Sequence, residues 1–234
     1  MKSKMFSIRT MTQLALLTAI TLVLAYTPLG YLRLGPINAS FLSVPVCIGA
    51  IVMGPGAGAF LGLVFGLTSF GNALIGGSQM GVALMAVSPA GYFAQAVVGR
   101  VLMGFCVGLI FRAVRRIDRR GMLSYVAGAV SAPVLNTVFY MGLMCLIFYG
   151  SDYVQDMVAA TGAANPILFV LAAVGVQGLV EVLVCGVLGC IVSKAVDTAL
   201  GHRIAVRPAA AEAFTAEQQE VAGVMPAADE VTQK

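Results

Sequence analysis

The chain has 234 residues, of which 59% are hydrophobic and only 10% are charged, and its formal net charge is +4. A soluble domain carries about 25% charged residues, so this composition excludes an ordinary soluble protein and indicates a protein that crosses the membrane several times. The basic excess does not indicate nucleic-acid binding, because the Lys and Arg residues flank apolar runs instead of covering a polar surface.

The first apolar run covers about residues 11–26 and follows the basic segment 1–10. No small-residue cleavage site follows this run, so it is predicted to be a transmembrane helix and not a signal peptide. Ala15 and Ala19 lie on one face of it, at a small-xxx-small spacing that permits close packing of helices. From the residues alone, this face is either an internal packing surface or a docking surface for another protein.

The next part of the chain is rich in Pro and Gly. Residues 27–36 form a loop that is a candidate lid, and residues 37–53 are predicted to be a second helix.

After a tight turn, the third run carries a ladder of glycines at every fourth position, namely Gly54, Gly58, Gly62 and Gly66. Such a ladder allows another helix backbone to approach very closely. It lacks the Lys and Ser or Thr of a nucleotide-binding P-loop, so no ATP site is expected.

The fourth run holds the one basic residue that lies inside an apolar run, Arg100. Residues 70–87, which precede it, are predicted to be an outer loop. The run itself lies within residues 88–120 and ends in a dense cluster of Arg residues. Counting about 1.5 Å per residue places Arg100 roughly 16 Å from Pro89, near the midplane of a hydrocarbon layer about 30 Å thick. A charge there needs a partner or a polar cavity, so Arg100 marks a candidate site.

The fifth and sixth apolar runs, residues 122–148 and 166–192, add polar side chains to this site. An acidic loop, residues 149–165, joins them and is assigned to the outside. Asn136 and Gln177 lie at a depth similar to that of Arg100, Glu181 lies about one turn deeper, and Tyr140 lies further outward, toward the mouth. Because polar groups in hydrocarbon need partners, the fourth, fifth and sixth runs are expected to face one another.

Two interpretations of these polar residues remain open. In the first, Arg100 and Glu181 form an ion pair that only fixes helix packing. In the second, Arg100 binds the carboxylate of a substrate while the other polar groups bind amides and hydroxyls. The residues assigned to such a pocket are Arg100, Asn136, Gln177, Tyr140, Tyr92, Gln95 and Glu181. No nucleophile–base pair, pair of catalytic carboxylates, metal-ligand cluster or cofactor motif occurs, so neither an enzyme nor a cofactor or metal is expected.

The distribution of basic residues predicts the topology. All Lys and Arg residues except Arg33 and Arg100 fall in segments assigned to the cytoplasmic side. The predicted fold is therefore all-α, a polytopic membrane protein with six transmembrane helices and both termini in the cytoplasm. Residues 1–206 are expected to form the transmembrane domain. Residues 207–234, which contain no long apolar run, are expected to form a disordered cytoplasmic tail.

Several short segments carry a resemblance to a known family. They are Leu34-Gly35-Pro36-Ile37, Val44-Pro45-Val46 followed by Ile48-Gly49-Ala50, the Gly54-Pro55 hairpin, residues 62–69 with the sequence GLVFGLTS, and Ala15-Leu16-Leu17-Thr18-Ala19. Together with the size and the predicted topology, these segments make the chain similar to the substrate-binding S component of energy-coupling factor (ECF) vitamin transporters. The resemblance is strongest to the pantothenate-type group.

The resemblance implies a function and a set of partners. The protein is expected to lie in the plasma membrane of a prokaryote, to capture a vitamin from outside, and to associate with a membrane coupling protein and two cytoplasmic ATPases. Ala15 and Ala19 match the family's AxxxA docking motif, and the glycine ladder would be a second smooth surface for sliding and docking. Pantothenate suits Arg100 through its carboxylate. Riboflavin, a deazapurine precursor, or a membrane scaffold role without transport remain as alternatives.

Overall fold

The computed structural model describes residues 8–27, 30–34, 37–118, 122–162 and 165–199. Residues 1–197 form one compact unit, and a second unit comprises residues 198–234. The tail predicted for residues 207–234 lies outside the described residues.

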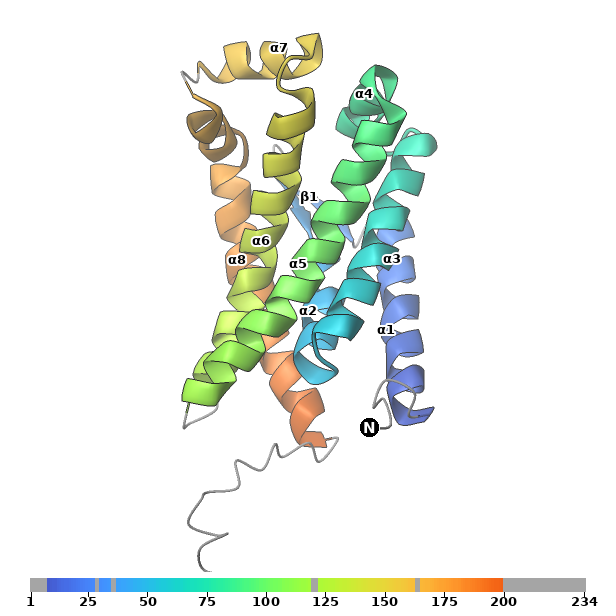
Figure 1. Cartoon of the computed structure of the whole chain (residues 1–234), viewed down its shortest axis with the longest axis vertical. Helices are drawn as coiled ribbons and strands as arrows, with labels where there is room; N and C mark the ends of the chain where they lie inside the picture. The colour runs from blue at the N-terminus through green and yellow to red at the C-terminus, as the bar shows by residue number, and fades with distance from the viewer. Residues whose placement is uncertain (1–7, 28–29, 35–36, 119–121, 163–164, 200–234) are drawn as a thin grey trace, which may run out of the picture. The chain divides into compact units, whose positions relative to one another are not determined.

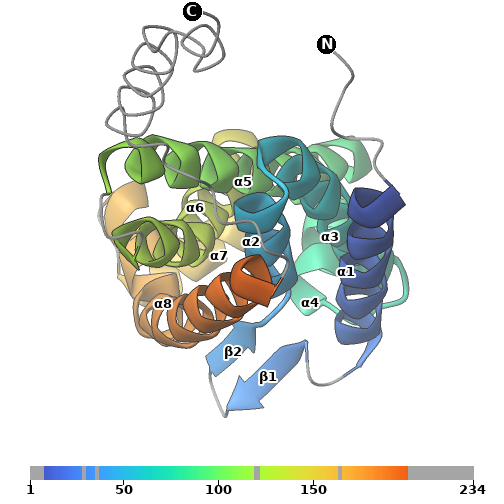
Figure 2. The same cartoon turned by 90° about the horizontal axis from the view of Figure 1, so that it is seen from below.

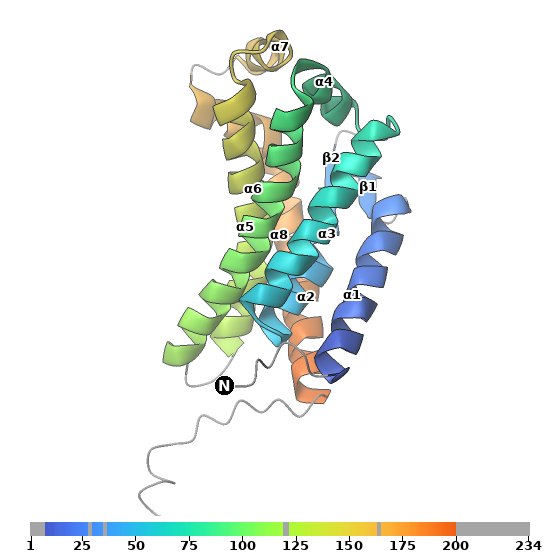
Figure 3. The same ribbon diagram turned by 45° about the vertical axis from the view of Figure 1, so that its right-hand side comes forward.

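The described chain is helical except for one short hairpin of strands. Its elements are α1 (Ile8–Tyr26), β1 (Tyr31–Leu34), β2 (Ile37–Ser40), α2 (Ser43–Val52), α3 (Pro55–Leu74), α4 (Gln79–Val87), α5 (Pro89–Ile117), α6 (Met122–Phe148), α7 (Asp152–Thr161) and α8 (Pro166–Ala199). In Figure 1, α4 and α7 lie at one end, whereas the start of α1 and the α2–α3 turn lie at the other. The long helices run between these two ends, as Figure 3 also shows.

Four helical segments among the described residues are long and apolar enough to cross a membrane. They are Pro55–Leu74, Pro89–Ile117, Met122–Phe148 and, within α8, Gly178–Val196. The apolar parts of α1 and α2 are shorter, at Thr10–Tyr26 and Ser43–Val52. A helix of 10 residues such as α2 is about 15 Å long, which is half of a hydrocarbon layer. The chain is therefore a helical membrane protein, while the crossing number of six and the cytoplasmic position of the termini stay predictions.

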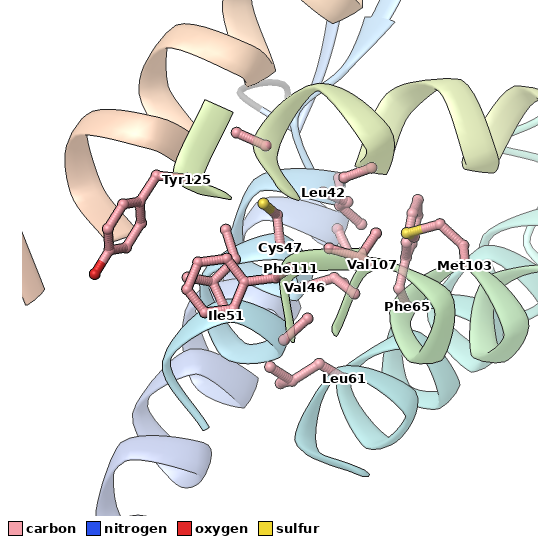
Figure 4. Packing of buried hydrophobic residues seen from close by; sticks show 14 residues of the cluster. Leu42, Val46, Cys47, Ile51, Leu61, Phe65, Met103, Val107, Phe111 and Tyr125 are labelled. Atoms are coloured by element: carbon pink, nitrogen blue, oxygen red, sulfur yellow. The ribbon is translucent and has the colours of Figure 1, made fainter. Parts of the chain in front are cut away.

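The short helix α2 lies at the centre of the bundle. In Figure 2 it is surrounded by longer helices, and it packs against α1, α3, α5 and α6. A helix that is apolar on all sides is suited to such a position. Figure 4 shows the surrounding cluster of buried side chains, which includes Leu42, Val46, Cys47, Ile51, Leu61, Phe65, Met103, Val107, Phe111 and Tyr125. This cluster fixes α2 and, with it, the end of the hairpin that precedes α2.

The glycine ladder of α3 packs against the backbone of α5. A Cβ atom added at Gly58 or at Gly62 would lie against the carbonyl oxygen of Gly104 or of Arg100, and one added at Gly66 would lie 2.7 Å from the Cα atom of Val97. These glycines therefore allow the two helix backbones to touch. The prediction of close approach is confirmed. The further expectation that the ladder forms a sliding surface is wrong, because α5 covers it.

The hairpin corrects the prediction that residues 37–53 form one helix. Residues 37–40 instead pair as β2 with β1 in an antiparallel register, with Leu34 opposite Ile37 and Tyr31 opposite Ser40. The helix begins only at Ser43, two residues before Pro45. Proline is best tolerated in the first turn of a helix, so Pro45 explains why α2 starts so late. The candidate lid, residues 27–36, overlaps β1, and its residues 28–29 and 35–36 lie outside the described part.

The two predicted outer loops also contain helices. Residues 70–87 include the end of α3 and the whole of α4, whose N-cap Ser78 accepts a hydrogen bond of 3.1 Å from the backbone N–H of Gly81. Residues 149–165 contain α7, which ends at Gly162 with a left-handed φ of 64°. Both helices have only 10 residues or fewer. They are thus too short to cross a membrane, and the placement of these segments outside the spans stands as a prediction.

The contact between α3 and α5 generates a prediction about stability. Gly62→Ala should lower the melting temperature in detergent, because its Cβ atom would meet the carbonyl of Arg100 and push the helices apart. Overpacking of this kind costs about 1–3 kcal/mol. Gly142→Ala in α6 is the matched control, since a Cβ atom there has no neighbour within 4 Å. Equal melting temperatures for both variants would show that the ladder does not determine the packing.

Candidate functional site

Arg100 is buried among three helices. Its side chain is 8% exposed, and its Nη1 donates a hydrogen bond of 2.9 Å to the carbonyl of Ala96, one turn earlier in α5. The guanidinium carbon lies 4.4 Å from the ring centroid of Phe65 in α3 and 4.7 Å from that of Tyr140 in α6. Two aromatic rings thus hold the charged group through cation–π contacts.

Part of the Arg100 guanidinium has no partner within the described protein. Its Nε atom is buried and makes no hydrogen bond. The N–H of Nε and that of one neighbouring Nη form the edge through which guanidinium groups bind carboxylates with two parallel hydrogen bonds. An unsatisfied donor in an apolar interior costs free energy. The Nε–H of Arg100 therefore lacks an acceptor within the described protein.

Gln95 places an unpartnered acceptor on the same helix as Arg100. Its side chain is fully buried, and its Nε2 donates a hydrogen bond of 3.3 Å to the backbone carbonyl of Tyr140. A carbonyl accepts only from the amide nitrogen, so this bond sets which end of the Gln95 amide faces Tyr140. The other end, Oε1, is buried without a hydrogen-bond partner. Tyr140 therefore positions both the Arg100 guanidinium, through its ring, and the Gln95 amide, through its backbone.

Asn136 adds a second acceptor, one turn before Tyr140 in α6. Its Oδ1 atom is buried and has no hydrogen-bond partner in the described structure. Three of the buried atoms that lack a hydrogen-bond partner among the described residues, on Arg100, Gln95 and Asn136, thus belong to α5 and α6, two helices that pack against each other. One of the three is a donor, on Arg100, and the other two are acceptors.

Arg100, Gln95 and Asn136 form a polar band in the bundle. Along α5 this band lies between two apolar clusters. The cluster around α2 includes Met103 and Val107 of α5, which follow Arg100 in the chain. A second cluster, near α4 and α7, includes Tyr92 and Ala96 of α5, together with residues of α6 and α8 such as Met144 and Phe169. The band is thus enclosed along α5 by apolar packing on both sides, which lowers the local dielectric and strengthens any charge–charge contact made there.

Glu181 joins α8 to the hairpin. It is 4% exposed, and its Oε1 accepts a hydrogen bond of 2.8 Å from the backbone N–H of Ser40, the last residue of β2. One turn later in α8, the thiol of Cys185 lies 3.3 Å from the hydroxyl of Ser43. The contacts described for Arg100 are with Ala96, Phe65 and Tyr140, and they do not include Glu181. In this structure the carboxylate of Glu181 therefore anchors the junction between β2 and α2.

Two other residues assigned to the pocket from the sequence are Tyr92 and Gln177. Tyr92 lies in an apolar cluster, and the side chain of Gln177 is not among those that the structure describes. Tyr92 is 2% exposed, belongs to the apolar cluster near α4, and stacks on Phe70 with 5.9 Å between ring centroids. A Cβ atom at Gly81 of α4 would lie 2.6 Å from the Tyr92 hydroxyl, so Tyr92 supports α4. Gln177 belongs to α8, but its side chain lies outside the described part of the structure.

The contact of Phe65 with Arg100 and the bond of Ser40 to Glu181 are not indicated by the sequence pattern. Phe65 looks like an ordinary core residue of an apolar helix. Its position three residues after Gly62 places it on the face that meets α5, and this is the one signal that relates it to Arg100. Ser40 falls within the segment predicted to be helical, where a partner on α8 is not expected. Among the described residues, no group of three or more His, Cys, Asp or Glu residues is arranged to hold a metal ion.

The face of α1 that carries Ala15 and Ala19 is exposed. Both alanines lie on the outside of the bundle, with Leu16 and Val23 at 62% and 61% exposure beside them. The internal side of α1 is instead marked by the buried Thr21 and Ala25. The small-residue stripe is thus available to a partner.

Comparison with known proteins gives two matches. Residues 9–193 match the family described as "ECF transporter, substrate-specific component". The chain is also 25% identical over 142 residues to the pantothenic acid transporter PanT of Lactococcus lactis subsp. cremoris (strain MG1363), an alignment that covers 57% of this chain and 72% of that protein.

The bond between Glu181 and Ser40 generates a prediction about stability. Glu181→Gln keeps an acceptor oxygen for the Ser40 N–H, so its thermal stability should stay close to that of the wild type. Glu181→Leu leaves that N–H buried without an acceptor, which costs about 1–3 kcal/mol. Thermal unfolding of both variants in the same detergent provides the measurement. Equal losses in the two variants would mean that the negative charge of Glu181, and not this hydrogen bond, stabilises the fold.

Proposed function

The chain belongs to the family of substrate-specific components of energy-coupling factor transporters, and we propose that it captures pantothenate for uptake. Members of this family bind small vitamins and work with a module made of a coupling protein and ATPases. The observation that carries the choice of ligand is the buried guanidinium of Arg100, whose Nε has no partner in the described protein.

The chemistry of pantothenate matches the polar band. Pantothenate has a carboxylate at one end, a secondary amide in the middle and two hydroxyl groups at the other end. The carboxylate binds the Nε edge of Arg100, while hydroxyl or amide donors bind the oxygens of Gln95 and Asn136. Each interaction satisfies an atom that is otherwise buried without a partner. The 25% identity to the PanT protein of Lactococcus lactis supports the same ligand.

The electrostatics favour an anionic ligand. A charge near the membrane midplane is costly and is stabilised by an opposite charge in the same low-dielectric region. A carboxylate at Arg100 meets this need, whereas riboflavin has no carboxylate to offer. A role as a scaffold without a ligand would leave the Nε of Arg100 and the oxygens of Gln95 and Asn136 without hydrogen bonds. Both alternatives are therefore less well supported than pantothenate.

Transport requires partners, since the sequence contains no P-loop. We assign the contact with a membrane coupling protein to the exposed face of α1 around Ala15 and Ala19. Helices in a membrane gain little from apolar burial, so small side chains that permit close approach supply much of their association energy. Two cytoplasmic ATPases would then drive uptake through the coupling protein.

Arg100→Lys tests the ligand assignment. Lys keeps the positive charge but loses the planar pair of donors, so we expect pantothenate binding to weaken at least tenfold, with a smaller relative change in stability. Isothermal titration in detergent gives the affinity, and the melting temperature without ligand gives the stability. Gln95→Leu should also weaken binding, because its Oε1 acceptor is lost. Unchanged affinity in Arg100→Lys would contradict the assignment.

Ala15→Trp combined with Ala19→Trp tests the docking face. Because both positions face away from the bundle, the double variant should bind pantothenate normally but fail to transport it in vesicles that contain the full complex. The matched control is Leu16→Trp with Ile20→Trp, which has the same spacing on the adjacent exposed face. Normal transport by the Ala15 and Ala19 variant would overturn the docking assignment. Loss of ligand binding would place the stripe inside the bundle.

A further inference from the structure

Helix α5 carries an exposed apolar stripe that ends in two arginines. Its residues recur at intervals of three or four, which places them on one face of the helix: Val98, Leu102, Phe105 and Leu109, with exposed fractions of 45%, 39%, 42% and 44%. The same face continues to Arg112 and Arg116, which are also exposed. One continuous surface is thus apolar over three turns and strongly basic at its end.

The two arginines at the end of this stripe are exposed, and the side chain of Arg112 also contacts the α2–α3 turn. The guanidinium of Arg112 lies beside Gly54, at the turn between α2 and α3, where a Cβ atom would meet its Nη2. Arg115 differs from them, because its Nη1 donates a hydrogen bond of 3.5 Å to Ser124 and its Cζ lies 5.7 Å from the ring centroid of Tyr125. Arg115 therefore stabilises the α5–α6 contact, and Arg112 and Arg116 form the exposed basic end.

The part of the stripe from Leu102 to Arg112 fits one leaflet of a bilayer. From Leu102 to Arg112 the helix rises about 15 Å, which is half of a hydrocarbon layer about 30 Å thick. A midplane position for Leu102 agrees with the depth predicted for Arg100. The guanidinium groups then lie where the hydrocarbon ends and the lipid phosphates begin.

We propose that this stripe binds an anionic phospholipid, with an acyl chain along Leu102 to Leu109 and the phosphate at Arg112 and Arg116. Guanidinium groups bind phosphate oxygens with paired hydrogen bonds, and basic residues at this level attract anionic lipids electrostatically. The stripe is distinct from the face of α1 assigned to the coupling protein, because α3 packs between α1 and α5 (Figure 2). The proposal concerns lipid recognition and does not depend on the identity of the vitamin.

The experiment exploits the absence of tryptophan from the chain. Leu109→Trp places a single fluorophore on the stripe, and the protein is reconstituted in phosphatidylcholine vesicles that contain a minority of phosphatidylglycerol, an anionic lipid that basic residues attract. Either the phosphatidylglycerol or an equal amount of the phosphatidylcholine is brominated, so that quenching reports which lipid lies beside the fluorophore. Leu146→Trp in α6 is the control position, since it is 82% exposed and no Lys or Arg occurs between residues 121 and 193.

The expected result is an enrichment of phosphatidylglycerol beside the fluorophore of Leu109→Trp of about fivefold relative to the control position, as expected when at least one basic residue contacts the headgroup. The enrichment should fall to the control value when Arg112→Gln and Arg116→Gln are added, while pantothenate affinity stays unchanged. Equal quenching by the two lipids at both positions would overturn the proposal. So would a loss of uptake in the arginine variants without any lipid enrichment in the wild type, because that result would assign the surface to a protein partner.

Discussion

A guanidinium group enclosed by apolar helices is the constraint on which this structure depends. Arg100 is held between the rings of Phe65 and Tyr140 and bonded to the carbonyl of Ala96. These contacts orient the group, but they supply no negative charge. Since a buried charge is costly in a membrane, an anion bound at Arg100, as proposed, would offset that cost. A substrate-capturing protein can use this gain as its source of affinity.

The packing of the bundle serves to hold this group in place. The glycines of α3 let its backbone touch α5 at the level of Arg100, which brings the Phe65 ring to the guanidinium. Apolar clusters on both sides of the polar band exclude competing polar contacts. Glu181 anchors the hairpin to α8 through Ser40. The exposed faces of α1 and α5 lie outside this packing around Arg100.

The sequence predicts the parts of the structure that follow from periodicity and from the cost of polar groups in hydrocarbon. The long helices and the close approach at the glycine ladder are of this kind. Tyr140 contacts both Arg100 and Gln95, while the assignment of these residues and Asn136 to one ligand pocket stays a prediction. The hairpin could not be predicted from hydropathy, because its strands are only four residues each and their pairing depends on contacts with α8. The contact of Phe65 with Arg100 and the bond of Glu181 to Ser40 depend on tertiary packing. Local sequence patterns do not indicate such contacts.

The central claim, that Arg100 binds the ligand's carboxylate, is tested most directly by a binding cycle with two proteins and two ligands. Wild type and Arg100→Met are each titrated with pantothenate and with its alcohol analogue, in which a hydroxymethyl group replaces the carboxylate. The account predicts that wild type prefers pantothenate strongly and that Arg100→Met does not distinguish the two, which gives a coupling free energy of about 2 kcal/mol or more. A coupling near zero, with Arg100→Met weakening both ligands equally, would show that Arg100 supports the fold and does not contact the carboxylate.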